Sequence, residues 1–314
     1  SLHEAEEEKE IKRFAHQYIN ELWYGDLMYG PYIQDGRKKK PTYLLAYIDD
    51  ASRLVLHGEF YYTQNLEALR HLFKEAVLKR GIPSILYTDN GKIYRSQQFE
   101  FMCANTGCTL IHSKPFVAHT RGKIERFFLT VRKRFLSSLD MNNIKSLEDL
   151  NLRFWKWLDE DYHKKPHSSL NGLTPLDFFM SQVTRVKLCT DPAQLEEKFL
   201  LRIKRKINHD GTFPINNILY ETDIKFPGLR VEIRYDPQWL DIPFMPVFIY
   251  HEGKKIGEAL QVNFNDNAHM KRRGRPEKPG LTVDLENNEV SVVFIDSPKS
   301  KQTISFKSIM EGEK

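Results

Sequence analysis

The sequence has no long apolar run and few cysteines. No stretch of about 18 apolar residues, the length that crosses a bilayer, occurs in the chain, so no membrane partner is expected. Cys103, Cys108 and Cys189 are an odd and small set, which argues against a disulfide framework and favours a reducing compartment. The acidic first ten residues lack the apolar segment of a secretory signal. We therefore expect a cytoplasmic protein.

Charge is unevenly distributed along the chain. The formal net charge is only +5, but between Lys114 and Arg134 there are seven Lys or Arg residues and a single acid. A local cluster of charge indicates the kind of partner that binds, whereas a small net charge does not. This basic cluster favours an anionic partner. At 314 residues the chain exceeds the roughly 100 to 200 residues of one domain, so two folded units are expected.

The first half of the chain predicts a mixed sheet. Three apolar runs separated by turn residues predict antiparallel strands, and after them helices and strands alternate. Asn65 is a plausible N-cap of the first helix, and the segment 81–83 (Gly-Ile-Pro) ends it. The expected strands are 22–33, 42–48, 54–62, 84–88 and 108–113, and the expected helices are 65–80 and 96–106. This order is that of the RNase H-like fold, an α/β class with a mixed five-stranded sheet and flanking helices.

The second half predicts helices and then a small all-β barrel. Residues 121–163 carry apolar positions at helical spacing, whereas short apolar runs separated by turn pairs such as Asp210-Gly211 begin near residue 200. The expected organisation is an N-terminal helical linker (1–20), an RNase H-like core (21–180), a linker (181–200), a β-barrel (201–264) and a basic, partly flexible tail (265–314).

Three carboxylates are candidates for a metal-dependent phosphodiester site. Cleavage and joining of DNA strands with divalent metals needs two or three carboxylates that converge on two ions about 3.5 to 4 Å apart. Asp26 interrupts an apolar strand, Asp89 ends another, and Glu125 lies in the first turns of the basic helix. In the predicted strand order the first two lie side by side, and a helix packed across them adds the third.

Each carboxylate also has a simpler interpretation. Asp89 begins an Asp-Asn-Gly sequence that is typical of turns, and Glu125 between two basic residues is typical of a solvated helix face. Asp49 and Asp50 compete with Asp26 for the first metal role, but they fall where two strands meet and are sufficiently explained by turn formation. The sequence therefore favours Asp26 over Asp49 and Asp50 as the first metal ligand.

The chain resembles the superfamily of DDE transposases and retroviral integrases, whose core carries an Asp, Asp-35-Glu signature. Thirty-five residues separate Asp89 from Glu125. Residues 200–262 resemble, more weakly, the C-terminal barrel of Mu phage-like transposases. The similar positions in the core are Trp23, 47–53 (Tyr-Ile-Asp-Asp-Ala-Ser-Arg), 81–83, 88–91 (Thr-Asp-Asn-Gly), 114–115 (Lys-Pro), 122–127 (Gly-Lys-Ile-Glu-Arg-Phe), Tyr162, 166–167 and 173–175.

The resemblance implies a DNA transposase that cleaves 3′ ends and transfers them into target DNA. It implies that Asp26, Asp89 and Glu125 are the catalytic residues and hold two Mg²⁺ ions, for which Mn²⁺ substitutes. It further implies a bacterial protein associated with the nucleoid when bound to DNA, assembled as a dimer or tetramer. The alternative is a catalytically silent DNA-binding derivative, a repressor or scaffold. A ribonuclease H or junction resolvase would need neither the 35-residue spacing nor the barrel.

Basic residues near the carboxylates are candidate DNA contacts. Arg132 lies seven residues after Glu125, and hence near its helix face. The segment 271–276 resembles an AT-hook, although a merely basic linker is equally compatible. Asn90 and His119 are weaker candidates for substrate or metal-supporting groups. The predicted DNA-binding set is Arg121, Lys123, Arg126, Arg132, Lys271, Arg273 and Arg275.

The cysteines and histidines of the core do not predict a zinc site. Cys103, Cys108 and His112 could suggest zinc, but buried thiols are the better interpretation. His163 and His167 do not form a metal site without cysteines.

The apolar segment 290–295 could dock onto an ATPase that selects target DNA, as the C-termini of Mu-like transposases do. Such transposases carry helix-turn-helix modules before the core, and only about 20 residues precede it here, so end recognition is supplied elsewhere or this is a fragment.

Overall fold

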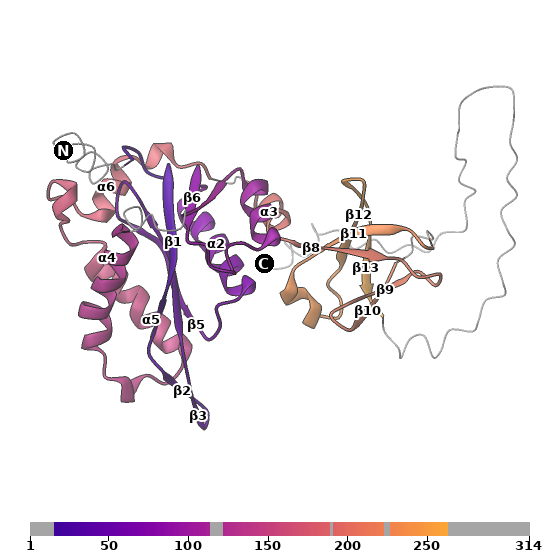
Figure 1. The fold of residues 1–314 in the computed structure, drawn as a ribbon, viewed down its shortest axis with the longest axis horizontal. Coiled ribbons are helices and arrows are strands. Elements are labelled where there is room, and N and C mark those ends of the chain that lie inside the picture. The colour runs from indigo at the N-terminus through magenta and orange to yellow at the C-terminus, as the bar shows by residue number, and fades with distance from the viewer. Residues whose placement is uncertain (1–15, 114–121, 189–190, 223–226, 263–314) are drawn as a thin grey trace, which may run out of the picture. The chain divides into compact units, whose positions relative to one another are not determined.

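The computed structural model describes residues 16–113, 122–188, 191–222 and 227–262 (Figure 1). The predicted docking segment at 290–295 and the basic tail lie outside the described residues. No helix of the described residues is both long and apolar enough to cross a membrane.

The first half folds around a mixed five-stranded sheet, in the order β5-β4-β1-β6-β7. Strand β1 pairs antiparallel with β4 and parallel with β6, while β4 and β5 are antiparallel and β6 and β7 are parallel. The predicted fold class is therefore confirmed. The strands are β1 (Leu22–Tyr29), β4 (Tyr43–Asp49), β5 (Val55–Tyr61), β6 (Ile85–Thr88) and β7 (Thr109–His112).

Helices cover both faces of this sheet. In Figure 1, α4 and α5 lie on one side of β1, and α2 and α3 lie on the other. Each face has its own apolar core, because alternate strand residues point to opposite sides. The helices of this half are α2 (Leu66–Arg80), α3 (Gln97–Thr106), α4 (Gly122–Thr130), η2 (Val131–Phe135), η3 (Leu136–Ser138), η4 (Met141–Asn143), α5 (Leu147–Trp157), η5 (Leu158–Tyr162), η6 (Ser168–Leu170), α6 (Pro175–Ser181) and η7 (Val183–Arg185).

Local sequence signals explain the ends of α2. The Asn65 side chain accepts a hydrogen bond from the Ala68 amide at 3.0 Å, as an N-cap does. Gly81 ends the helix with a φ of 84°, a conformation that favours glycine. Both predicted boundaries of this helix are confirmed.

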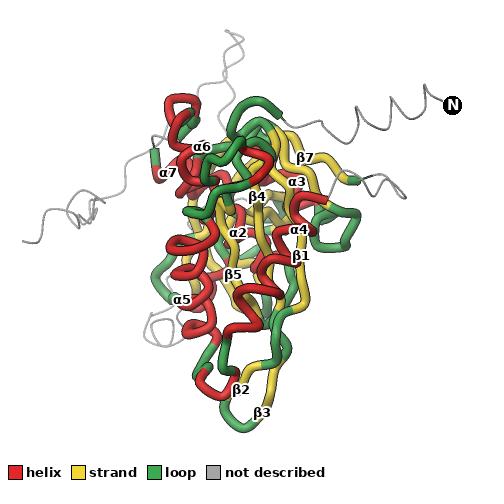
Figure 2. The backbone as a smooth tube through the Cα atoms, turned by 90° about the vertical axis from the view of Figure 1, so that its left-hand side faces the viewer, coloured by secondary structure: helices red, strands yellow, loops and turns green. Residues whose placement is uncertain are grey.

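One expected strand is interrupted in the structure. The apolar run 22–33 was expected to form a single strand, but β1 ends at Tyr29, and a separate hairpin of β2 (Ile33–Asp35) and β3 (Lys38–Lys40) follows it. Pro31 has no amide hydrogen to donate to a sheet, and its carbonyl accepts a hydrogen bond from the Thr42 hydroxyl at 2.7 Å. The hairpin projects from the end of the sheet in Figure 2.

The second half forms a nearly closed antiparallel barrel of six strands, in the order β8-β11-β12-β13-β10-β9. Its core is separate from those of the first sheet and includes Phe213 and Tyr220, whose stacked rings lie 6.2 Å apart. The exact domain boundaries stay a prediction. The elements are α7 (Pro192–Lys198), β8 (Leu201–Lys206), β9 (Thr212–Ile215), β10 (Ile218–Glu221), β11 (Arg230–Tyr235), η8 (Pro237–Asp241), β12 (Val247–His251) and β13 (Lys254–Gln261).

Candidate active site

Two tyrosines show how the sheet arranges the first two predicted carboxylates. Tyr24 of β1 and Tyr87 of β6 are paired across these parallel strands, and their ring centroids lie 5.7 Å apart. Both rings pack on the face that α4 and α5 cover. Asp26 lies in β1 two residues after Tyr24, and Asp89 follows the last residue of β6, two residues after Tyr87. Because Gly25 pairs with Thr88, the two aspartates come directly after a pair of residues on adjacent parallel strands.

Both aspartates are half-buried and are oriented by nearby backbone amides. The Leu27 amide donates to Asp26 Oδ1 at 2.8 Å, and the Gly91 amide donates to Asp89 Oδ1 at 2.9 Å. Gly91 leaves no space for a side chain here, because a Cβ atom would lie 2.8 Å from Asp89 Oδ1. The Asp-Asn-Gly turn is thus formed as its sequence predicts, and it also fixes the Asp89 carboxylate.

Glu125 lies in the first turn of α4. The buried Ile124 and Phe128 pack this helix against the same apolar core as Tyr24. Glu125 itself is exposed, so its side chain is accessible to a ligand. The carboxylates of Asp26, Asp89 and Glu125 do not all approach within 4.8 Å: throughout the described residues, the group with that spacing is His57, Glu59 and His71.

Lys123 attaches the start of α4 to the turn between β4 and β5. Its ammonium donates a hydrogen bond to the buried carboxylate of Asp50. Burial, followed by repulsion from Arg53, lowers the pKa of Lys123. This lysine was predicted to contact DNA; the structure shows it in an intramolecular ion pair, and its DNA contact stays a prediction. The sequence offered no signal for the pairing, because the two residues are 73 positions apart.

Asp49 behaves as the turn interpretation predicts. Its Oδ2 accepts hydrogen bonds from the Ser52 amide at 2.8 Å and from the Ser52 hydroxyl at 2.6 Å. Its Oδ1 accepts from the Asn20 amide at 2.8 Å. Burial raises the pKa of this carboxyl group, and the Ser52 hydrogen bonds oppose that effect. Asp49 is thus occupied with holding the chain rather than exposed to a substrate.

The remaining predicted DNA contacts divide into exposed and undescribed residues. Arg126 and Arg132 are both exposed on the α4–η2 segment. Asn90 donates from Nδ2 to the Ser113 carbonyl at 2.5 Å, which joins the ends of β6 and β7. The other candidates, which lie outside the described residues, are Arg121, Lys271, Arg273, Arg275 and His119.

The alternative zinc set does not assemble. Cys103 and Cys108 are free, buried thiols, as predicted. His112 uses Nδ1 in contacts with the Thr88 hydroxyl at 3.1 Å and the Asp89 carbonyl at 3.3 Å. His112 therefore supports the end of β6, next to Asp89, instead of joining the two cysteines.

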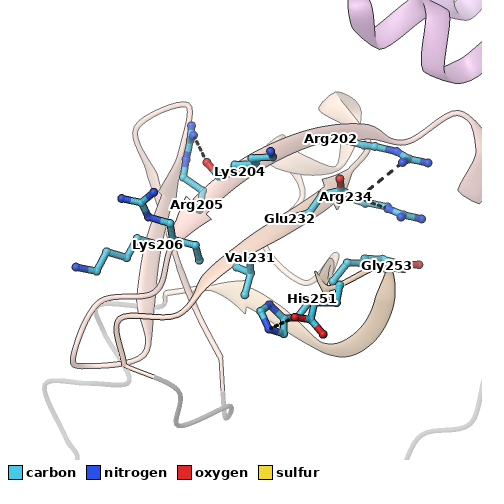
Figure 3. Close-up of a pocket in the computed structure, with 12 residues that line it drawn as sticks. Arg202, Lys204, Arg205, Lys206, Val231, Glu232, Arg234, His251 and Gly253 are labelled. Carbon is cyan, nitrogen blue, oxygen red and sulfur yellow. Dashed lines mark hydrogen bonds and ion pairs between the residues drawn. The ribbon is translucent and has the colours of Figure 1, made fainter.

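A basic groove on the barrel was missed by the sequence reasoning. It has a volume of about 700 Å³ and is lined mainly by β8 and β11 (Figure 3). Arg202, Lys204 and Lys206 alternate along β8 and pair with Arg234, Glu232 and Arg230 of β11. Glu232 lies 2.8 Å from Arg234 Nε and 3.8 Å from Arg202 Nη1 and partly neutralises both, whereas Lys204, Lys206 and Arg230 are exposed. The alternating basic residues in Leu201–Lys206 were the feature of the sequence that could have predicted this groove.

Family models match both halves of the chain. Two models described as "Integrase core domain" match residues 17–117 and 106–175, and together they span about half of the chain. A model described as "Mu transposase, C-terminal" matches residues 196–258.

Curated relatives include bacterial transposases. The transposase for transposon Tn552 of Staphylococcus aureus is 31% identical over 246 residues, which cover 69% of this chain and 50% of that protein. The transposase for insertion sequence IS1202 of Streptococcus pneumoniae is 25% identical over 175 residues, 51% of this chain and 36% of that protein. The chain spans half or less of the length of these two relatives.

Solved structures that align with the chain include viral integrases. A simian T-cell lymphotropic virus intasome in complex with PP2A regulatory subunit B56 gamma aligns with a TM-score of 0.47 and 15% identity, covering 79% of this chain and 78% of that one. The HTLV-2 integrase catalytic core domain in complex with magnesium (trimeric form) aligns with a TM-score of 0.42 and 20% identity, over 52% of this chain and 97% of that one. On the family models and the transposase relatives, the chain belongs to the transposase and retroviral integrase superfamily, with an integrase core domain followed by a Mu transposase C-terminal domain.

Proposed function

We propose that the chain is the catalytic part of a metal-dependent DNA transposase that cleaves the 3′ ends of transposon DNA and transfers them into target DNA. The observation that carries this proposal is that Asp26 of β1 and Asp89, which follows the last residue of β6, come directly after the paired residues Gly25 and Thr88 of these parallel strands. Glu125 on that helix is the proposed third carboxylate. The Tn552 transposase relative supports the same activity.

The chemistry of these side chains fits divalent metal ions. Carboxylate oxygens are the ligands that Mg²⁺ and Mn²⁺ prefer, and the exposed Glu125 is accessible to a ligand. We propose that Asp26, Asp89 and Glu125 hold two Mg²⁺ ions, with Mn²⁺ as a substitute. When bound, such ions polarise the phosphate oxygens and lower the pKa of bound water.

The proposed reaction has two in-line displacements at phosphorus. In the first, a water oxygen attacks, the bond from phosphorus to the 3′-oxygen breaks, and a free 3′-hydroxyl and a 5′-phosphate result. In the second, this 3′-oxygen attacks a target phosphodiester, and the 3′-oxygen of the target strand leaves. Within the chain, the Leu27 and Gly91 amides orient the two aspartates, and the Lys123–Asp50 pair holds the start of the helix that bears Glu125.

Double-stranded DNA, as transposon end and as target, is the proposed substrate. Arg126 and Arg132 are exposed on the helical segment of Glu125, and the barrel groove adds Lys204, Lys206 and Arg230. Cations that contact phosphates give sequence-independent affinity that falls with salt. Arg121, Lys271, Arg273 and Arg275 remain proposed contacts. A dimer or tetramer is proposed because two transposon ends must be joined together, and an ATPase docked on the tail at 290–295 remains a proposal.

A strand-transfer assay tests the proposal. Purified protein is incubated with pre-cleaved transposon-end DNA and Mg²⁺ or Mn²⁺, and wild type is compared with Glu125→Gln. Bound metal ions stabilise a transition state of this kind by several kcal/mol. Glu125→Gln should therefore reduce the rate of joining at least about 100-fold. The exposed Glu160 supplies the matched control, Glu160→Gln, which should join at the wild-type rate.

The outcome also separates enzyme from binding protein. Joining that disappears in Glu125→Gln while DNA binding persists would support a catalytic carboxylate. DNA binding by the wild type without joining, in either metal and with full-length ends, would instead favour the catalytically silent repressor or scaffold.

A further inference from the structure

A second cluster of ligand-type side chains lies on the edge of the sheet, away from the proposed active site. His57, Glu59 and Tyr61 alternate along β5, so they share one face of that strand. His71 approaches the same place from α2. Strand β4 separates β5 from β1, which carries Asp26, so the cluster is not part of the carboxylate site.

The distances within the cluster suit one small metal ion. Glu59 Oε2 lies 3.0 Å from His57 Nε2 and 3.4 Å from His71 Nδ1, and these three ligand atoms lie within 4.8 Å of one another. Ligand atoms about 2.0–2.1 Å from a tetrahedral zinc ion are about 3.3 Å apart. The hydroxyl of Tyr61 is 3.1 Å from Glu59 Oε2 and 3.0 Å from His71 Nδ1, close to where a fourth ligand would lie.

We propose that His57 Nε2, Glu59 Oε2 and His71 Nδ1 bind a divalent transition-metal ion of the zinc class, with water or the Tyr61 hydroxyl as the fourth ligand. Two imidazoles and one carboxylate favour zinc over Mg²⁺ or Ca²⁺, which prefer oxygen ligands throughout. The ion ties the edge strand β5 to helix α2. The side chain of His71 is 39% exposed while that of His57 is 4% exposed, so the ion enters from the His71 side.

The surroundings of His57 define what zinc binding must change. Lys79 Nζ lies 3.3 Å from His57 Nδ1, so without metal the Nε2 proton faces Glu59 and Nδ1 accepts from the lysine. Zinc binding moves the proton to Nδ1 and breaks that contact, after which Lys79 retains its ion pair with Glu75 at 3.0 Å. Trp155 stacks on His57 with the ring centroids 6.0 Å apart and keeps the imidazole in place. Lys79 therefore opposes binding, which gives the proposal a distinctive test.

The experiment is a calorimetric titration of the full chain with Zn²⁺ alone, followed by the visible absorption of Co²⁺ as a zinc substitute. All proteins carry Asp89→Asn, which weakens ion binding at the proposed catalytic carboxylates. The wild-type cluster is compared with His71→Gln and Glu59→Gln, and with the control His209→Gln, which removes an exposed histidine elsewhere. We expect one Zn²⁺ per chain, and binding at least about tenfold weaker in both cluster variants but not in the control.

Two further readouts distinguish a metal site from a hydrogen-bond network that merely joins β5 to α2. Zn²⁺ should raise the Tm of the intact cluster but not of His71→Gln, because only a ligand that binds the folded state stabilises it. Lys79→Met should bind Zn²⁺ more tightly than the parent, since it removes the opposing cation. Absence of stoichiometric Zn²⁺ binding, or binding unchanged in both folded cluster variants, would overturn the proposal.

Discussion

The Lys123 ammonium at the start of α4 is hydrogen-bonded to the Asp50 carboxylate at the end of β4. The side chain of Asp50 is 1% exposed and that of Lys123 is 22% exposed, so most of the pair is shielded from water. Glu125 follows Lys123 by two residues, in the same helical turn. Among the described residues, this ion pair and the packing of the buried Ile124 hold the start of the helix to the sheet.

Breaking the Lys123–Asp50 pair is predicted to raise the Mg²⁺ concentration that strand transfer requires, in addition to lowering the folding stability. In Lys123→Met the Asp50 charge stays buried without its ammonium partner, which costs on the order of 1–3 kcal/mol of folding free energy. The start of α4 is then less constrained, so Glu125 is held less firmly for metal binding. We expect the Mg²⁺ concentration needed for half-maximal strand transfer to rise, as measured by titration of the metal in the joining assay.

The matched control is Lys133→Met, which removes an exposed lysine from the neighbouring helical segment. It should leave the Mg²⁺ dependence unchanged. If Lys123→Met lost DNA affinity at unchanged Mg²⁺ dependence, the lysine would act as a direct DNA contact and not as a positioning residue.

A methyl group at Gly91 is predicted to displace the Asp89 carboxylate. The added Cβ would lie 2.8 Å from Asp89 Oδ1, and the end of this short side chain is the part that can move. A carboxylate shifted from its position lowers strand transfer by about 10- to 100-fold, by analogy with the loss of a metal-supporting contact. The measurement is the joining rate at saturating Mg²⁺, together with the Tm.

Gly122→Ala is the control for this substitution, because no atom of the described residues lies within 4 Å of the Cβ that it adds. It should keep both the joining rate and the Tm. Wild-type joining by Gly91→Ala would mean that the position of Asp89 tolerates displacement, which would weaken its assignment as a metal ligand.

Local patterns predicted most of the core because they depend on neighbouring residues. Asn65 and Gly81 marked the ends of α2 through capping chemistry, and both are confirmed. The strand order predicted that β1 and β6 would be neighbours, and the pairing of Gly25 with Thr88, directly before Asp26 and Asp89, agrees with it. That the two carboxylates share one site stays a prediction. These features follow from propensity and periodicity, which a sequence displays directly.

Contacts between distant segments were not predictable in the same way. Lys123 was assigned to DNA because a lysine in a basic helix is usually solvated, and nothing in the sequence indicates that Asp50 is buried beside it. The cluster at His57 requires α2 to cross over β5 so that His71 reaches Glu59, which depends on packing geometry. The β2–β3 hairpin was missed because Pro31 was read as part of an apolar run.

The groove on the barrel is predicted to contribute to DNA affinity through phosphate contacts. Lys204 and Lys206 are exposed on the same face of β8. Replacing both by Gln should weaken binding of any duplex sequence and reduce the slope of log affinity against log salt by about 2, one for each lost phosphate contact. Filter binding or fluorescence anisotropy at several salt concentrations measures the slope.

Two exposed lysines of the core, Lys145 and Lys156, provide a control with the same change in net charge. The double variant Lys145→Gln/Lys156→Gln should change the slope less than the groove variant. Equal slopes for the two double variants would show that general charge, and not the groove, determines the affinity.

His163 is predicted to make stability depend on pH in the acidic range. Its side chain is 4% exposed, and burial, followed by the nearby Arg80, lowers its pKa to about 4. In the unfolded chain a histidine binds a proton below about pH 6.5, whereas the folded His163 stays neutral. Between these two values unfolding takes up a proton, so the free energy of unfolding falls as pH decreases, by at most about 1.4 kcal/mol per pH unit.

His163→Leu removes this proton uptake, so its free energy of unfolding, measured with urea between pH 7 and pH 4.5, should fall less steeply than that of the wild type. The exposed His209, changed to Gln, should retain the wild-type slope. Identical slopes for wild type and His163→Leu would mean that the folded protein protonates this histidine as readily as the unfolded chain does, and that the buried imidazole is not the source of acid sensitivity.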